Sequence, residues 1–389
     1  MQEIPIVLIG HQDHGKSTLI GRLILDSGSI TESRVNEIKS IDESAGQKFE
    51  LAHLVDSFRE EREREMTMDT TRAILKGKER NYQLIDVPGH AELIANMLTG
   101  AAGAEAALLL VSIEEGIKEQ TRQHLEIAKL LGIEQLGVVV NKMDTVDYNE
   151  KAFSDVKDKL KAILTDIGYL AEDIYFFPIS AGEGENVIRK SEKTPWYQGS
   201  TVMGFLEKEI KVPESFENLP LTFLIQDKYS EEGKDILIGL VEAGKMVSGQ
   251  EILFLPLNRK AKVKLIRDSE EELGEAEAGC NIGILLSEDF DLKRGSVGTL
   301  PESNLKIDKE ISGEIFWIKK PSQRKLVLEC GTAQTEGELK DPEIVNDGEK
   351  TSYRIIIDEP IVFEPKGKTI LGKIVLKDQG KIIGVGNIL

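Results

Sequence analysis

This chain of 389 residues has little cysteine, no long apolar run and a shortage of basic side chains. Its two cysteines, Cys280 and Cys330, cannot build a disulfide framework or a zinc site unaided, which fits a reducing compartment. The apolar run near the N-terminus, Ile4–Ile9, is far shorter than the roughly 20 residues that a membrane-spanning helix needs. We therefore expect a cytoplasmic protein with neither a membrane partner nor a secretory leader.

Acidic residues outnumber basic ones, with 68 Asp and Glu against 49 Lys and Arg and a net charge of −19. Residues 304–389 carry 14 residues of each sign, so the whole acidic excess lies in the first 303 residues. A nucleic-acid-binding surface needs basic side chains that release counterions from phosphates. This composition disfavours an RNA partner, although a local basic patch would still permit one.

The segment Gly10–Ser17 has the sequence G-H-Q-D-H-G-K-S and directly follows the apolar run Ile4–Ile9. This spacing predicts a phosphate loop between a buried strand and a helix, which makes a plain surface loop a poor alternative. Its glycines let backbone N–H groups turn toward phosphate oxygens. Lys16 is expected to reach the outer phosphates, and the Ser17 hydroxyl is expected to bind magnesium. The chain is therefore predicted to bind a nucleoside triphosphate.

A second motif, Asn141–Asp144 with the sequence N-K-M-D, predicts that the base is guanine. The Asp144 carboxylate would accept two hydrogen bonds from guanine, whereas adenine lacks that pair of donors. The stem of Lys142 would cover the base, and Asn141 would tie this loop to the phosphate loop. Ser180-Ala181 follows a third apolar run and is expected to support guanine O6 through backbone N–H groups.

Two further segments supply the parts of a hydrolytic switch. Asp86–Gly89 closes an apolar run, so that Asp86 can hold a magnesium-bound water and the Gly89 N–H can approach the γ-phosphate. Thr67 is the candidate switch threonine for magnesium. His90 is the candidate for orienting the attacking water. The charged run Arg59–Glu65 fits a mobile switch and a solvated helix face equally well.

The candidate residues form three overlapping sets. Asp13 would lie close to the phosphates, where a monovalent cation could balance its charge, and His11 and His14 are expected to shape the loop. No arginine is clearly placed as a built-in finger, so we expect slow intrinsic turnover. The predicted nucleotide-binding residues are Gly10, Asp13, His14, Gly15, Lys16, Ser17, Thr18, Asp86, Gly89, Asn141, Lys142, Asp144, Ser180 and Ala181; the predicted magnesium ligands are Ser17, Thr67 and Asp86; and the predicted catalytic residues are His90, Thr67 and Lys16.

The pattern of apolar residues predicts three domains. Residues 1–212 alternate short apolar runs with amphipathic stretches, which predicts an α/β P-loop domain with a doubly wound, mostly parallel sheet. Its ligands are expected at the carboxyl ends of the strands. Residues 219–303 and 304–389 instead alternate apolar and polar positions between glycines, which predicts two antiparallel β-barrels.

The motifs together resemble the translation-factor class of GTPases, over nearly the whole chain. Within that class they are most similar to the large, GTP-hydrolysing subunit of sulfate adenylyltransferase, and elongation factor 1-alpha shares several of them, including a form of the Pro-Trp-Tyr segment. The segments that carry the resemblance are Gly10–Leu23, Ala52–Asp69, Asp86–His90, Asn96–Gly100, Gln120–His124, Asn141–Tyr148, Glu185–Val187, Pro195–Gly199 and Asp358–Phe363.

The resemblance implies one of three functions. As the sulfate adenylyltransferase subunit, the chain would couple GTP hydrolysis to adenylyl sulfate formation from ATP and sulfate by a small ATP sulfurylase partner. As an elongation factor 1-alpha-like protein it would deliver aminoacyl-tRNA to the ribosome; as a paralogue it would serve another partner. The acidic charge and Val146–Tyr148 favour the first, and Cys330–Ala333 supports the second. Met66 and Gln12, where these families usually have isoleucine and valine, motivate the third.

Overall fold

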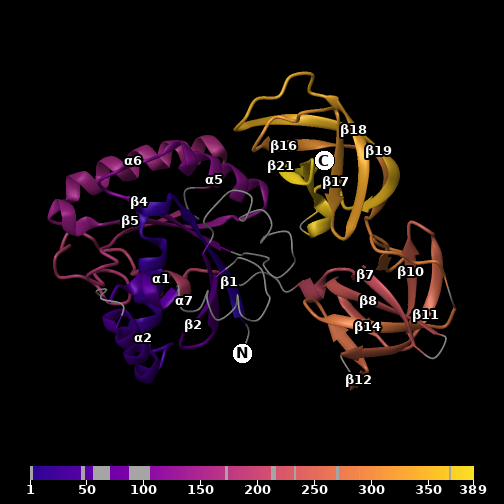
Figure 1. Ribbon diagram of the computed structural model, residues 1–389, viewed down its shortest axis with the longest axis horizontal. Helices are drawn as coiled ribbons and strands as arrows, with labels where there is room; N and C mark the ends of the chain where they lie inside the picture. The colour runs from indigo at the N-terminus through magenta and orange to yellow at the C-terminus, as the bar shows by residue number, and fades with distance from the viewer. Residues whose placement is uncertain are drawn as a thin grey trace. The chain divides into compact units, whose positions relative to one another are not determined.

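The computed structural model describes residues 3–44, 49–55, 71–86, 106–170, 174–211, 216–231, 234–268, 271–288, 290–367 and 369–389. They form two compact units that divide between residues 212 and 213. The first unit contains helices and a sheet, and the second is built almost entirely from strands (Figure 1). Among the described helices, none is both long and apolar enough to cross a membrane.

The first unit is organised around a six-stranded sheet with the order β2-β3-β1-β4-β5-β6. Every neighbouring pair is parallel except β2 and β3, which run antiparallel. This is the mostly parallel sheet that the alternating pattern predicts. The strands span Glu3–Gly10 (β1), Thr71–Lys76 (β2), Asn81–Asp86 (β3), Ala106–Ser112 (β4), Gln135–Asn141 (β5) and Ile174–Pro178 (β6).

Helices cover both faces of this sheet (Figure 1). Leu23 of α1 and Leu206 of α7 belong to the same buried cluster as Ile6 and Leu8 of β1. Strand side chains alternate between faces, so Val7 points to the opposite side, where α5 and α6 lie (Figure 1). The helices span Lys16–Asp26 (α1), Glu32–Ser44 (α2), Glu119–Leu130 (α5), Glu150–Ile167 (α6) and Val202–Lys208 (α7), with 3-10 turns at Gln12–His14 (η1) and Met143–Val146 (η2).

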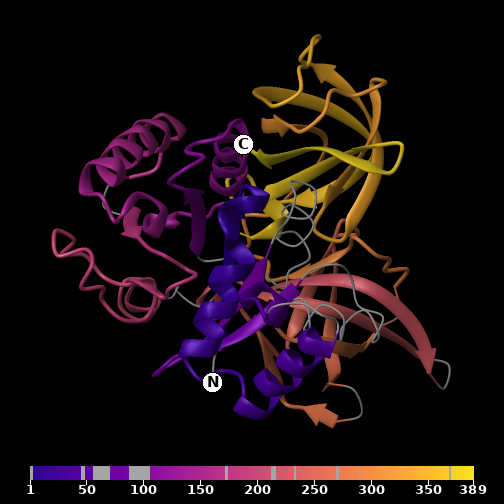
Figure 2. The same ribbon diagram turned by 60° about the vertical axis from the view of Figure 1, so that its left-hand side comes forward.

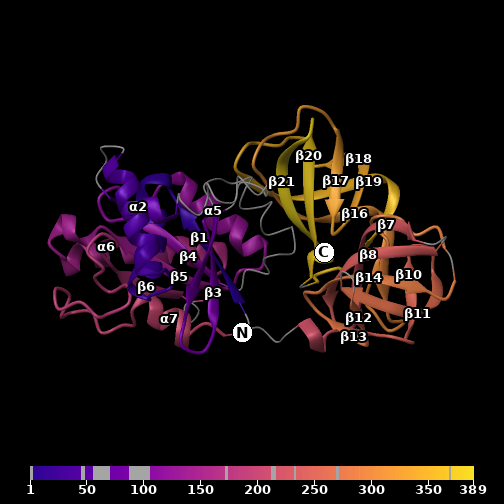
Figure 3. The ribbon, with the colours of Figure 1, turned by 60° about the horizontal axis from the view of Figure 1, so that its bottom comes forward.

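The second unit begins with a short 3-10 turn at Phe216–Asn218 (η4) and continues into an antiparallel barrel. Strand β10 pairs with both β15 and β11, so six strands form a closed circuit of pairings around a core that includes Phe223 and Phe254 (Figure 3). The strands span Thr222–Glu231 (β7), Lys234–Ala243 (β8), Lys245–Val247 (β9), Glu251–Leu255 (β10), Arg259–Asp268 (β11), Glu271–Leu273 (β12), Glu275–Glu277 (β13), Asn281–Leu286 (β14) and Val297–Thr299 (β15).

The C-terminal strands form a second closed barrel with the order β16-β19-β18-β17-β20-β21, drawn in orange to yellow in Figure 2. Trp317 lies fully buried in its core. One apolar cluster joins the two barrels, because Leu224 and Leu255 of the first pack with residues such as Leu371 of the second. The predicted boundary at 303/304 falls between β15 and β16 and stays a prediction. The strands span Lys306–Trp317 (β16), Lys325–Cys330 (β17), Ala333–Asp341 (β18), Glu349–Phe363 (β19), Lys373–Asp378 (β20) and Lys381–Ile388 (β21), with a 3-10 turn at Ile370–Gly372 (η5).

Candidate functional site

The predicted phosphate and base loops meet at one edge of the parallel sheet. Strands β1, β3, β4, β5 and β6 run in the same direction, and their register places Leu8 opposite Asp86, Gly10 opposite Leu110, and Ser112 opposite Asn141. The carboxyl ends of neighbouring parallel strands lie together, which is where an open α/β sheet binds its ligands. The sheet order thus brings together motifs that lie about 170 residues apart in the chain.

The two glycines of the phosphate loop are required by its neighbours. Gly10 has φ +140° and Gly15 has φ +91°, a backbone region that favours glycine. A Cβ on Gly10 would lie 2.4 Å from Leu110 O, and one on Gly15 would lie 2.5 Å from Asn141 Nδ2. Close packing against β4 and the base loop therefore selects glycine at these positions, in addition to the approach of phosphate.

Lys16 lies across this loop with only 4% of its surface exposed. Its Nζ donates hydrogen bonds to Gly10 O and His11 O, each at 3.0 Å. Burial lowers the pKa of the Lys16 ammonium, an effect that the charges of Asp86 and Asp13 partly offset. An anionic phosphate beside Lys16 would compensate for this burial and stabilise the charged form.

Ser17 and Asp86 meet at the start of α1. Ser17 Oγ donates to Asp86 Oδ2 at 3.1 Å, although the two residues lie 69 positions apart. A hydroxyl and a carboxylate are the hard oxygen donors that magnesium prefers, so this pair fits the predicted metal position. Thr18 follows in the first turn of α1 and is half-buried, and Asp13 lies exposed in η1.

Asn141 connects three loops through its buried side-chain amide. Its Nδ2 donates to His14 O at 2.9 Å, and its Oδ1 accepts from the Ala181 N–H at 3.0 Å. The Ser180 N–H in turn donates to Glu185 O. The structure therefore shows the expected tie to the phosphate loop. Both N–H groups predicted to support guanine O6 have protein acceptors here, so that part of the hypothesis stays a prediction.

The base loop leaves its aspartate accessible. Lys142 has φ +64° and precedes the 3-10 turn η2, in which Met143 is buried and Asp144 is exposed. The Met143 N–H donates to Ile179 O at 3.0 Å, which fixes this turn against the loop after β6. Asp144 can therefore meet an incoming base without breaking a contact of the core.

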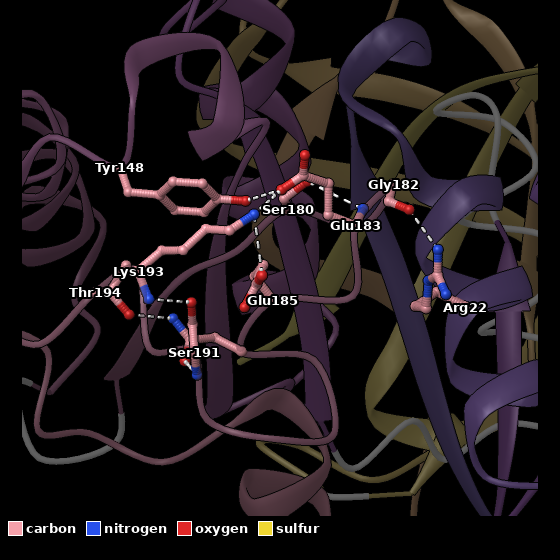
Figure 4. Close-up of polar contacts among 10 residues, drawn as sticks. Arg22, Tyr148, Ser180, Gly182, Glu183, Glu185, Ser191, Lys193 and Thr194 are labelled. Atoms are coloured by element: carbon pink, nitrogen blue, oxygen red, sulfur yellow. Dashed lines mark hydrogen bonds and ion pairs between the residues drawn. The ribbon is translucent and has the colours of Figure 1, made fainter.

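A polar cluster behind the base loop was not predicted from the sequence (Figure 4). Tyr148 OH donates to Glu183 Oε2 at 2.5 Å, and Lys193 Nζ pairs with the same carboxylate at 2.6 Å. Trp196 Nε1 donates to Tyr148 O at 3.1 Å, and Arg22 of α1 donates to Gly182 O on the other side. Burial, followed by the bond to Glu183, raises the pKa of Tyr148, so the hydroxyl remains a donor. The cluster links the loop after β5 to the loop after β6.

Three predicted residues of the switch, Thr67, Gly89 and His90, lie outside the described residues. The remaining candidates from the phosphate, magnesium and base motifs all lie at the sheet edge described above. The signal for the missed cluster was present in the segments Asn141–Tyr148 and Pro195–Gly199, but their pairing depends on the order of β5 and β6 in the sheet.

Comparison with known proteins identifies the family. A model of the elongation factor Tu GTP-binding domain family matches residues 2–253 of this chain. The chain belongs to this family.

Relatives extend the similarity to the whole length of the chain. Elongation factor 1-alpha of Methanoculleus marisnigri is 35% identical over 407 residues, which cover 98% of this chain and 95% of the relative. The Methanothermobacter thermautotrophicus protein of the same name is 34% identical over 410 residues, covering 99% and 97%. That of Pyrococcus woesei is 35% identical over 419 residues, covering 99% and 96%.

The chain is therefore a GTPase of the translation-factor class, which confirms the class and the fold predicted from the motifs. The barrels that follow the nucleotide-binding unit also lie within the aligned length. The names of these relatives favour the elongation factor alternative over the sulfate adenylyltransferase subunit that the motifs alone ranked first.

Proposed function

We propose that this chain is an elongation factor 1-alpha-like switch, whose GTP-bound state carries aminoacyl-tRNA to the ribosome and releases it after hydrolysis. The observation that carries the proposal is the similarity to elongation factor 1-alpha across 98–99% of the chain, through the barrels as well as the nucleotide-binding unit. A shared phosphate loop alone would indicate only nucleotide binding, whereas this similarity also extends over the two barrels. The proposal places the chain in the cytoplasm, where ribosomes act.

The residues of the site have distinct roles in this proposal. Lys16 neutralises the outer phosphates, Ser17 and Asp86 hold magnesium, and Asp144 selects guanine. Magnesium, when bound, neutralises charge on the phosphate oxygens. His90 orients the attacking water and Thr67 couples the switch to the γ-phosphate. Asp13 would hold a monovalent cation that balances its charge near the phosphates.

The segments that suggested the sulfate adenylyltransferase subunit have an internal structural role. Tyr148, in the segment Asn141–Tyr148, bonds to Glu183, and Trp196 bonds to the Tyr148 carbonyl. Asn186 Nδ2 donates to Pro178 O at 2.8 Å and to Thr194 Oγ1 at 2.9 Å. These contacts stabilise the loops that are predicted to bind guanine. A GTPase needs these loops whichever partner it serves. The segments Asn141–Tyr148, Glu185–Val187 and Pro195–Gly199 therefore do not distinguish the two functions.

Coupling to a small ATP sulfurylase subunit remains the second candidate because of the charge. The net charge of −19 is unfavourable for binding tRNA phosphates. It does not disfavour binding to a protein partner. The two candidates predict different partners for the same GTP-bound state.

The experiment is a capture from the native cell extract, with the tagged chain loaded either with a non-hydrolysable GTP analogue or with GDP. We expect aminoacyl-tRNA on the analogue-loaded chain and its loss with GDP. A second readout is the half-life of the aminoacyl ester in purified aminoacyl-tRNA, which the GTP-bound chain should lengthen. Recovery of an ATP sulfurylase subunit without tRNA would replace the proposal with sulfate activation, and recovery of neither would indicate a paralogue with another partner.

A further inference from the structure

Two histidines of the phosphate loop lie close to a glutamate from another loop, and none of the three belongs to the Ser17–Asp86 pair. His11 precedes η1 and His14 is the last residue of this turn, and Glu115 lies in the turn after β4. One potential ligand atom from each side chain lies within 4.8 Å of those of the other two. The neighbouring position of β1 and β4 in the sheet brings these residues together.

The orientation of His14 is fixed by the backbone of β4. His14 is fully buried, and its Nδ1 lies 3.0 Å from Leu110 O. A carbonyl oxygen can only accept, so Nδ1 carries the hydrogen and Nε2 keeps its lone pair. Histidine ligands of metals commonly donate their second ring N–H to a backbone carbonyl in this way. The arrangement turns the lone pair of Nε2 toward Glu115.

One buried ring nitrogen of each histidine lacks a protein partner. His14 Nε2 and His11 Nδ1 are buried and have no hydrogen-bond partner among the described residues. His14 Nε2 lies 3.8 Å from Glu115 Oε2, which is too long for a hydrogen bond. A buried polar atom without a partner calls for a ligand or a water.

We propose that His11, His14 and Glu115 bind a divalent transition-metal ion, with Zn²⁺ as the natural occupant. Two imidazoles and one carboxylate suit Zn²⁺, Co²⁺ or Ni²⁺, whereas Mg²⁺ and Ca²⁺ prefer sets of oxygen ligands. Three protein ligands leave one position for water. Ligands of a tetrahedral zinc ion lie about 3.3 Å apart, given zinc–nitrogen distances of about 2.0–2.1 Å. His11 and Glu115, which are only partly buried, move inward by about 1 Å to reach this geometry.

Lys118 competes with a metal ion for the glutamate. Its Nζ lies 3.3 Å from Glu115 Oε2, and its side chain is 41% exposed, so it can withdraw into solvent. Removal of the Lys118 charge should therefore tighten metal binding, an effect that a purely structural role of the histidines does not produce. The site also bears on the phosphate loop, because His11 O accepts the hydrogen bond from Lys16 Nζ.

The test is a titration of the full chain with Zn²⁺ in competition with a chromophoric chelator, in excess Mg²⁺ and GDP so that the magnesium position is filled. A Cys280→Ser background removes the exposed thiol. We expect one tight Zn²⁺ per chain and intense visible absorption when Co²⁺ replaces it. His11→Gln and Glu115→Gln should each weaken Zn²⁺ binding at least about tenfold. Lys118→Met should strengthen it.

The matched control is His53→Gln. His53 Nδ1 lies 2.8 Å from Asp42 Oδ2, a histidine–carboxylate pair outside the cluster, so this change should leave Zn²⁺ binding unaltered. Circular dichroism checks that each variant is folded. If His11→Gln fails to fold, the Zn²⁺ affinities of Glu115→Gln and Lys118→Met test the proposal, because both residues are partly exposed. No binding at micromolar Zn²⁺, or equal binding by the wild-type chain and both ligand variants, would overturn the proposal.

Discussion

Asn141→Ala tests whether the three loops of the nucleotide site act as one structure. The Asn141 side chain is 3% exposed and makes two hydrogen bonds, to His14 O at 2.9 Å and from Ala181 N at 3.0 Å. Alanine removes both and leaves a buried carbonyl and a buried N–H unpaired. At about 1–3 kcal/mol for each unsatisfied buried group, the total cost is about 2–6 kcal/mol.

We expect part of this cost to appear in nucleotide affinity, because GDP binding requires the phosphate loop and the base loop in register. If at least about 1.4 kcal/mol is expressed in binding, the Kd for GDP rises about tenfold or more. The assay is equilibrium titration with a fluorescent GDP analogue, together with denaturant unfolding of the nucleotide-free chain.

The matched control is Asn149→Ala in the same unit. Asn149 caps α6 by accepting a hydrogen bond from Ala152 N at 2.9 Å, and it does not contact the phosphate loop. Its loss should cost about 1 kcal/mol of stability and leave the Kd for GDP unchanged. If Asn141→Ala binds GDP as tightly as Asn149→Ala does, the reasoning that Asn141 couples the loops is refuted.

Three further predictions concern other parts of the chain. Tyr148→Phe removes the hydrogen bond from the hydroxyl to Glu183. Because one hydrogen bond contributes about 0.5–1.5 kcal/mol, GDP release should be about 2–10-fold faster in stopped-flow measurements. An unchanged rate would show that the cluster does not stabilise the base loop. Burial raises the pKa of Glu242 in the native state. As the pH rises above about 4.5, the unfolded chain loses the proton of this carboxyl before the native chain does, so the free energy of unfolding falls. Glu242→Gln should therefore stabilise the barrels at pH 7 and have little effect near pH 4, and equal melting shifts at both pH values would contradict this. Burial raises the pKa of Cys330 to about 12 and Cys280 is exposed, so a thiol reagent should label one cysteine in the native chain and two after unfolding, whereas two in the native chain would contradict the burial.

Sequence patterns were sufficient to predict the parallel sheet and the loops at its edge, because each motif directly follows an apolar run that forms a strand. Gly10–Ser17 after β1 and Asn141–Asp144 after β5 are examples in which local order alone places the residues. The barrels were also predictable from alternation and glycine spacing. The order in which the strands pair was not predicted, because the pairing of β10 with both β11 and β15 is a property of the whole unit.

The missed parts of the site depend on contacts between distant segments. Asp147 and Tyr148 adopt positive φ values of 49° and 56° before Tyr148 reaches Glu183, and such a conformation is uncommon for a tyrosine. His14 and Glu115 approach each other because β1 and β4 are neighbours, although they are not consecutive in the chain. The motifs also could not rank the partners, since Tyr148, Asn186 and Trp196, which lie in three of the segments behind that ranking, make contacts within the nucleotide-binding unit.

The most direct test of the central claim, a guanine-specific switch, compares binding of GDP, ADP and xanthosine diphosphate to the wild-type chain and to Asp144→Asn. Asp144 is exposed beside the buried Asn141, so the variant should fold normally. We predict tight binding of GDP and weak binding of ADP by the wild-type chain, and a shift of preference toward xanthosine diphosphate in the variant. Equal binding of GDP and ADP by the wild-type chain, or unchanged GDP affinity in Asp144→Asn, would contradict the account.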